Sequence, residues 1–175
     1  YDSGILINET KPQWESKPGY DDFKDIWKQP HNPELWMKNS CVWYSQVLTQ
    51  KLGMTKFKDY IVKFSYGNQD VSGDKGKNNG LITSWLSSSL EISPEEQIAF
   101  LQKFVAKKLP VNNKAYTMTK KILFLEELPG GWKLYGKTGA GPQLSSDKMN
   151  RLDLWEGWFV GFIQKDKKTA PEVQV

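Results

Sequence analysis

Cysteine, histidine and arginine each occur only once in this chain, as Cys41, His31 and Arg151. A single cysteine excludes an internal disulfide and a zinc site built on several thiolates. One histidine cannot supply a histidine-rich site either, so we expect no metal chemistry. Long apolar runs are also missing, since none approaches the roughly 18 residues that a membrane-spanning helix needs. The sequence therefore predicts neither a metal centre nor a membrane span.

Positive charge is present but is spread along the chain. The formal net charge is +4, and carboxylates are interleaved with the lysines. The densest lysine clusters are short: Lys107-Lys108, Lys120-Lys121 and Lys165 to Lys168. Solvated surface explains such clusters, and no nucleic-acid recognition motif accompanies them. We expect no nucleic-acid partner, and a mild positive field that favours anionic small substrates.

A length of 175 residues suits one domain, which we expect to cover residues 1–175. Four prolines predict an irregular segment over residues 1–34, followed by a mainly helical region over residues 35–128. Sheet strands are expected over residues 132–165. Three aromatic residues should pin the irregular segment to the body: Trp14, Tyr20 and Trp27.

Four helices are predicted in the helical region. Apolar residues recur at helical spacing from Leu35 to Leu52, and a second helix opens at Thr55. The strongest local signal is the run from Ser93 to Glu96, with a serine cap, a proline at the first helical position and a glutamate three residues after the cap. This helix is predicted to continue to Leu109, and another to span Ala115 to Leu128.

The hydrophobic period changes after Leu128. Trp132 to Thr138 and Gly157 to Gln164 have strand patterns, and the second is almost continuously apolar, as a central strand is. Thr169 to Val175 has no strand pattern. Helices followed by paired strands indicate an α+β fold, with a helical region packed on an antiparallel sheet. Two strands are too few for a stable sheet, so we expect the sheet to be incomplete.

Residues suited to acyl chemistry occur in two places, about a hundred positions apart. Lys137-Thr138-Gly139 ends the first predicted strand, and Ser40-Cys41-Val42 lies on the first predicted helix. A cation, a hydroxyl and a bare backbone at a strand edge suit an acyl substrate with a carboxylate, and the serine suits proton transfer. Taken alone, Ser40 is better explained as a serine bonded back to a carbonyl of its helix, and Lys137 can be explained as a solvated edge lysine.

The order of four motifs adds weight to these residues. Ser-Cys-Val is followed by Tyr66-Gly67-Asn68, then by Trp85-Leu86 ahead of a helix, and finally by Lys-Thr-Gly. From about Leu35 to Gln164 this series resembles the class D serine β-lactamases, the oxacillinase family. The resemblance implies the serine β-lactamase and penicillin-binding transpeptidase-like fold. It also implies a periplasmic or secreted bacterial protein that hydrolyses β-lactam antibiotics through a serine acyl-enzyme.

The family's Ser-x-x-Lys motif, which carries the nucleophile, precedes all of these motifs. This chain matches the bare pattern only at Ser72 to Lys75 and at Ser145 to Lys148, both in polar loop sequence after the Ser-Cys-Val motif. We interpret both as coincidental. We therefore expect a fragment that lacks the N-terminal Ser-x-x-Lys segment and the C-terminal strand and helix, and that is inactive alone. A non-catalytic relic is an alternative.

The resemblance also implies roles for single residues. Ser40 passes a proton to the leaving β-lactam nitrogen, and Lys137 attracts a substrate carboxylate and assists that transfer by its field. Thr138 and Gly139 bind substrate along the strand, and the backbone N–H of Ala140 is one oxyanion donor. The carboxylate-binding arginine of the family is usually found beyond this region, so Arg151 is not given that role.

A further group of residues is implied to surround a lysine that the family keeps carbamylated by carbon dioxide. Val42 and Leu86 would keep its pocket apolar, so that the amine stays neutral, and Trp85 N–H would donate to the carbamate. Carbon dioxide is thus the one cofactor implied. The Tyr66-Gly67-Asn68 motif is expected to be structural, with the glycine for a turn and Asn68 to hold the loop.

Two rival functions share the fold. A β-lactam-sensing receptor domain would keep its acyl group, and such domains commonly carry asparagine at the position of Val42. A cell-wall transpeptidase would pass the acyl group to an amine, and the Val42 and Trp85-Leu86 pattern argues against it. The substrate spectrum and the oligomeric state are not determined by the sequence.

Overall fold

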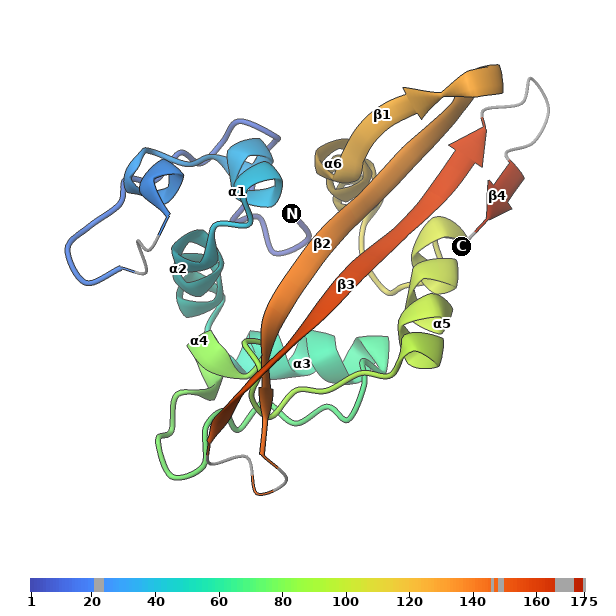
Figure 1. Cartoon of the computed structure of the whole chain (residues 1–175). Helices are drawn as coiled ribbons and strands as arrows, with labels where there is room; N and C mark the ends of the chain where they lie inside the picture. Colours follow the sequence, from blue (N-terminus) through green and yellow to red (C-terminus); the bar gives the residue numbers. More distant parts are fainter. Residues whose placement is uncertain (21–23, 146, 148–149, 166–171, 175) are drawn as a thin grey trace.

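The computed structural model describes residues 1–20, 24–145, 147, 150–165 and 172–174. The helices and strands follow one another in this order: the 3-10 helix η1 (Asp25–Lys28), α1 (Pro33–Asn39), α2 (Val42–Leu52), α3 (Met54–Phe64), α4 (Gly80–Thr83), α5 (Pro94–Val105), α6 (Asn113–Leu123), β1 (Phe124–Leu128), the 3-10 helix η2 (Pro129–Gly131), β2 (Trp132–Leu144), β3 (Arg151–Lys165) and β4 (Glu172–Gln174). The strands pair antiparallel in the order β1-β2-β3-β4, with helices beside them (Figure 1). The α+β prediction is confirmed.

The long hairpin of β2 and β3 forms one side of a core beneath α5 and α6. Tyr135 on β2 lies opposite Phe162 on β3, and their rings stack with centroids 4.9 Å apart. Leu101 of α5 completes the buried cluster. Burying three large apolar side chains contributes roughly 1.5–3 kcal/mol each. This core holds the middle of β2 in a fixed position against the helices.

A second core joins the first 34 residues to α2. Its buried members include Leu6, Trp27 and Trp43. The ring of Trp14 stacks on Tyr44 at 4.4 Å, and the ring of Tyr20 stacks on Trp43 at 5.4 Å. The prediction that Trp14, Tyr20 and Trp27 pin the N-terminal segment is confirmed.

The helix predicted from Leu35 to Leu52 is in fact two helices, α1 and α2, so the prediction of one continuous helix was wrong. Ser40 adopts a left-handed conformation, with φ 53° and ψ 43°, and ends α1. The Cys41 N–H donates to Trp36 O at 3.1 Å and the Ser40 N–H to Met37 O at 3.4 Å. These two bonds close a Schellman turn, in which glycine is the usual left-handed residue.

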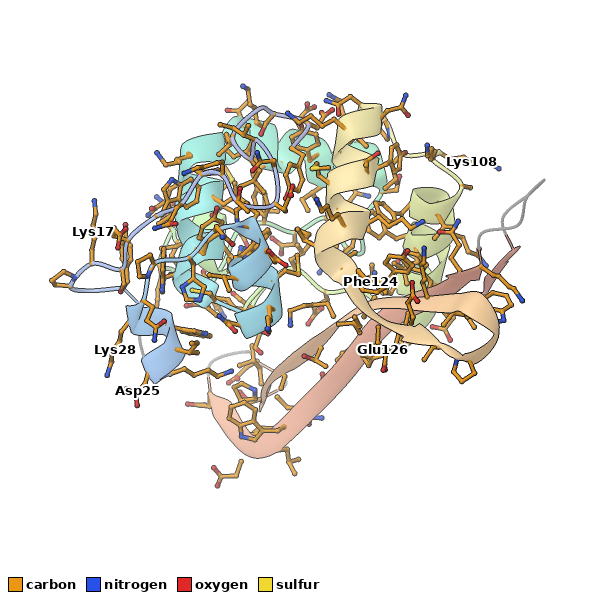
Figure 2. All side chains as sticks on the ribbon, turned by 90° about the horizontal axis from the view of Figure 1, so that it is seen from above. Lys17, Asp25, Lys28, Lys108, Phe124 and Glu126 are labelled. Atoms are coloured by element: carbon orange, nitrogen blue, oxygen red, sulfur yellow. The ribbon has the colours of Figure 1, made fainter. Side chains whose placement is uncertain are left out.

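The predicted helix ends after residue 93 also differ. The capping box at Ser93 is confirmed, but α5 ends at Val105 rather than at Leu109. The helix expected to reach Leu128 ends at Leu123, because the following residues pair with β2 as strand β1. Figure 2 shows Phe124 at this junction, with Glu126 further along β1.

The sheet is larger than the sequence predicts. Strands β2 and β3 are longer than expected, and β4 pairs with the end of β3 where no strand was predicted. The open edge of β3 offers backbone donors and acceptors, which outweigh the weak strand preference of Glu172–Gln174. Residues 169–171 and 175 of the predicted non-strand tail lie outside the described residues.

Candidate active site

Lys137 and Ser40 are brought into hydrogen-bond contact, although they are 97 positions apart. The Lys137 ammonium donates to Ser40 Oγ and to the backbone oxygen of Thr138, the latter at 2.7 Å. Thr138 Oγ1 lies 3.4 Å from the same nitrogen. The structure therefore places a half-buried cation directly on the serine hydroxyl, at the edge of the sheet.

The hydroxyl of Ser40 reaches Lys137 because of the break between α1 and α2. A left-handed backbone at a residue other than glycine costs about 1–2 kcal/mol. That cost is offset by the Schellman turn and by Cys41, which is fully buried as the next residue. Ser40 thus lies at the end of a helix, not within one as its spacing suggested, and its side chain leaves the helix surface.

Lys137 is held by the register of the hairpin. It lies opposite Val160, next to the facing pair Gly136 and Gly161. A Cβ atom on Gly136 would lie 2.6 Å from Cζ of Phe159, and one on Gly161 would lie 2.5 Å from the backbone oxygen of Tyr135. The clash at Gly161 is with backbone, so glycine there lets β2 and β3 approach closely, whereas the nearest atoms at Gly136 belong to the exposed ring of Phe159.

Burial lowers the pKa of Lys137 below its ordinary value, and the nearby charge of Lys24 lowers that pKa further. The Lys24 ammonium itself lies 5.3 Å from the ring centre of Trp27. An ammonium with a lowered pKa is a better proton donor than an exposed lysine, which suits a group bonded to a proton-transferring serine.

Trp85 and Leu86 follow α4, which packs against α2. The indole N–H of Trp85 is buried and has no hydrogen-bond partner among the described residues. A buried donor in that state costs about 1–3 kcal/mol. Val42 and Leu86 are partly buried.

The strand residues after Lys137 are accessible. Thr138, Gly139 and Ala140 are exposed on β2, and a Cβ on Gly139 would meet only Trp158, at 4.0 Å. Further along, a Cβ on Gly141 would lie 2.4 Å from Ser87 Oγ. The loop that carries Trp85 and Leu86 therefore packs on β2 four residues after Lys137.

The Tyr66-Gly67-Asn68 motif is tied to the segment that precedes α5. Gly67 has φ 52°, and a Cβ there would lie 1.9 Å from the backbone oxygen of Glu91. Asn68 Nδ2 donates to Ser89 O at 2.8 Å, and its Oδ1 accepts from the N–H of Glu91 at 3.1 Å. These contacts hold the loop of the motif against the residues before α5, and none of them involves Lys137.

The two Ser-x-x-Lys matches lie apart from this site. Ser72 and Lys75 are exposed in the loop before α4. Ser145 Oγ donates to Asp147 Oδ1 at 2.6 Å, and Lys148 lies outside the described residues.

Lys24 was missed by sequence reasoning, because a lone lysine in an irregular segment carries no signal. Among the described residues, no group of three or more His, Cys, Asp or Glu could hold a metal ion. In the same part of the chain, no helix has the length and apolar character required to cross a membrane.

Comparisons with known proteins show which family the chain belongs to. The family model of the penicillin-binding protein transpeptidase domain matches residues 1–171. Beta-lactamase OXA-9 of Klebsiella pneumoniae is 47% identical over 167 residues, which are 95% of this chain and 61% of the relative. Beta-lactamase OXA-1 of Escherichia coli is 48% identical over 163 residues, 93% of this chain and 56% of the relative. The chain thus spans less than two thirds of these relatives.

Similarity in three dimensions extends over almost the whole chain. The crystal structure of the OXA-427 class D β-lactamase superposes with a TM-score of 0.91 at 43% identity, covering 99% of this chain and 73% of that one. Sequence identity, the family model and the fold therefore agree, and we conclude that the chain belongs to the class D β-lactamases, which have the penicillin-binding transpeptidase fold.

Proposed function

We propose that the complete protein hydrolyses β-lactams through a serine acyl-enzyme. The observation that carries this proposal is the hydrogen bond between Lys137 and Ser40, which couples a cation to a hydroxyl at an accessible strand edge. The relatives named above as β-lactamases support it. Neither Ser72, which is exposed in a loop, nor Ser145, which donates to Asp147, is proposed as the nucleophile.

Within this reaction, Lys137 attracts the carboxylate of the substrate to the edge of β2. When the serine ester forms and the β-lactam C–N bond breaks, Ser40 gives its hydroxyl proton to the departing nitrogen, and the proton that the attacking serine releases to its base would return to Ser40. The Lys137 ammonium stabilises the negative charge that develops on Ser40 Oγ. Thr138 and Gly139 hold the substrate along the strand, and the Ala140 N–H donates to the oxyanion.

Deacylation in this proposal depends on a lysine carbamate, formed with carbon dioxide, that supplies the base for the attacking water. Trp85 Nε1, which has no partner among the described residues, fits as a donor to a carbamate oxygen. Val42 and Leu86 exclude water from the pocket, and an apolar pocket keeps the lysine amine neutral enough to react. The protein would act on small-molecule β-lactams in the periplasm or outside the cell.

Mass spectrometry of the full-length protein mixed with a penicillin tests this function. We expect an acyl adduct that forms and is released quickly, and Ser40→Ala should slow its formation. Ser72→Ala, which changes an exposed loop serine, is the matched control and should behave as wild type. An adduct that lasts for hours would favour a receptor, and transfer to an added amine would favour a transpeptidase. Absence of both an adduct and penicillin hydrolysis would refute the proposal.

A further inference from the structure

Asn39, the residue before Ser40, is held through both its main chain and its side chain. Its backbone oxygen accepts a hydrogen bond from Trp27 Nε1 at 2.9 Å. Its side-chain nitrogen Nδ2 lies 3.1 Å from Nε2 of His31. Both partners are buried, each with only 1% of its surface exposed. Asn39 is therefore fixed at the last turn of α1, immediately before the left-handed residue.

The hydrogen bonds of the His31 ring show which partner donates in its contact with Asn39. His31 Nδ1 lies 2.8 Å from the backbone oxygen of Gln29, and a carbonyl can only accept. Nδ1 therefore carries the hydrogen, and Nε2 accepts from the amide of Asn39. The backbone of His31 pairs with Trp14 in both directions, and its ring packs edge-on against Trp43. The acceptor offered to Asn39 is thus rigid.

We propose that His31 and Asn39 are positioning residues, whose contact holds Ser40 in the conformation that presents its hydroxyl to Lys137. Ser40 is not glycine, so its left-handed backbone has to be maintained by its surroundings. Its own turn bond to Met37, at 3.4 Å, is long. Once Asn39 is released, Ser40 relaxes toward the right-handed region and Oγ leaves Lys137. The inference rests on the proposed role of Ser40 in proton transfer.

Cys41 offers a probe that needs no β-lactam chemistry. It follows Ser40 directly, is the only cysteine of these 175 residues and has no exposed surface. A thiol reagent can modify it only when the joint between α1 and α2 opens. The rate of its modification in the full-length protein, followed on the peptide that contains it, measures how firmly Ser40 is held.

The test compares Asn39→Ala with Asn32→Ala. Asn32 caps the other end of α1, where its Oδ1 accepts from the N–H of Leu35 at 2.9 Å, so its loss weakens the same helix without touching Ser40. We expect Asn39→Ala to modify Cys41 roughly tenfold faster and to slow acylation by penicillin by a similar factor, because one buried hydrogen bond is lost. Asn32→Ala should change both rates less than about twofold.

His31→Phe keeps an aromatic ring but removes both the Nε2 acceptor and the Nδ1 donor to Gln29 O, so it should raise the rate of Cys41 modification at least as much as Asn39→Ala. Equal rates of Cys41 modification in Asn39→Ala and Asn32→Ala would overturn the inference, as would faster modification of Cys41 with unchanged acylation. If wild type neither forms an acyl adduct nor hydrolyses penicillin, the proposed function fails, while the Cys41 rates still decide whether His31 and Asn39 hold the joint.

Discussion

The surroundings of the Lys137 ammonium lower its pKa. Burial is the larger cause of its lowered pKa, and the charge of Lys24 is the smaller one. Because Lys24 comes from the N-terminal segment and Lys137 from β2, the packing of that segment tunes the site. Two cations near a strand edge also raise the local concentration of an anionic substrate.

Lys24→Gln should shift the pH dependence of acylation to higher pH. Lys137 must be protonated in the proposed reaction, so the rate falls as pH rises through its lowered pKa. Removing the neighbouring positive charge raises that pKa, and the alkaline fall then begins later. Rates of acyl-adduct formation across a pH series measure the shift. Lys28→Gln serves as the control, because Lys28 is exposed and paired with Asp25. If the acylation rate of Lys24→Gln falls at the same alkaline pH as that of wild type, the expectation is contradicted.

Trp85→Phe should slow deacylation much more than acylation. The substitution keeps most of the ring but removes the buried N–H, so a carbamate would lose a donor and carbon dioxide would leave more readily. The acyl adduct should persist, added bicarbonate should partly restore turnover, and Val42→Asn should act in the same direction by wetting the pocket. Trp132→Phe, on a partly exposed ring, is the matched control. Deacylation at the wild-type rate in both pocket variants would exclude this role.

The types of the site residues could be predicted from the sequence, but their geometry could not. The motif residues Ser40 and Lys137 carry their chemistry in their side chains, so order and spacing identify them. Ser40 was placed within a helix because apolar periodicity does not register a single left-handed residue when it is not glycine. The contact between His31 and Asn39 depends on how an irregular stretch packs on the end of α1, for which a sequence pattern gives no signal.

The start of helix α5 could be predicted from local sequence alone. Ser93 Oγ accepts from the N–H of Glu96 at 3.3 Å, and the Ser93 N–H donates to Glu96 Oε2 at 2.8 Å. The starts of helices are predictable in such cases because the cap residues and their partners lie three positions apart. Asn112, which caps α6 by accepting from the N–H of Ala115, carried the same kind of signal and would have corrected the predicted start.

Ser93→Ala should destabilise the protein by about 1 kcal/mol, the typical loss when a helix cap is removed. The change leaves the N–H of Glu96 without its side-chain partner and breaks the reciprocal bond. Urea unfolding monitored by circular dichroism gives the free energy of unfolding. Glu95→Gln, in the same turn but outside the capping box, should cost at most about 0.5 kcal/mol, and equal losses in the two variants would argue against the cap as the cause.

Helix ends and strand partners depend on more distant contacts. The residues after Leu123 continue a helical pattern, yet they pair with β2, with Leu128 opposite Trp132. Pairing with β2 outweighs the local preference, as tertiary context often does. The same holds for β4, whose three residues are strand only because β3 offers an edge.

For the molecule as a whole, one carboxylate connects three parts of the chain. Asp2 Oδ2 accepts from Tyr60 OH at 2.6 Å, and its Oδ1 accepts from the N–H of Asn112 at 2.8 Å. These bonds tie the N-terminal segment to α3 and to the start of α6. The hydrogen bond from Tyr60 is the main cause of the lowered pKa of Asp2.

Asp2→Asn should reduce the loss of stability in acid. A carboxyl whose pKa is lowered by folding stabilises the protein above its unfolded pKa of about 3.9, and that contribution is lost as pH falls through the lowered value. The variant lacks this contribution at neutral pH and so has less to lose. Thermal unfolding midpoints at pH 7 and at about pH 3 measure the difference. A variant whose midpoint falls as steeply as that of wild type would contradict the assignment to Asp2.

The fold class was predictable because helical and strand periods are segregated along the chain, whereas the arrangement of the parts was not. The local sequence pattern does not predict that Asp2 contacts Asn112, or that β2 lies beside the end of α1.

The contact between Lys137 and Ser40 also bears on the order of folding. The β2–β3 hairpin and helix α5 are specified by near neighbours, whereas this contact closes a loop of 97 positions, and the entropy cost of closure grows with length. We expect the contact between Lys137 and Ser40 to form after the hairpin and after α5. A full-length protein that had regained its helices and hairpin would still lack the proposed activity, so that activity should return last on refolding and disappear first on warming, before the secondary structure melts.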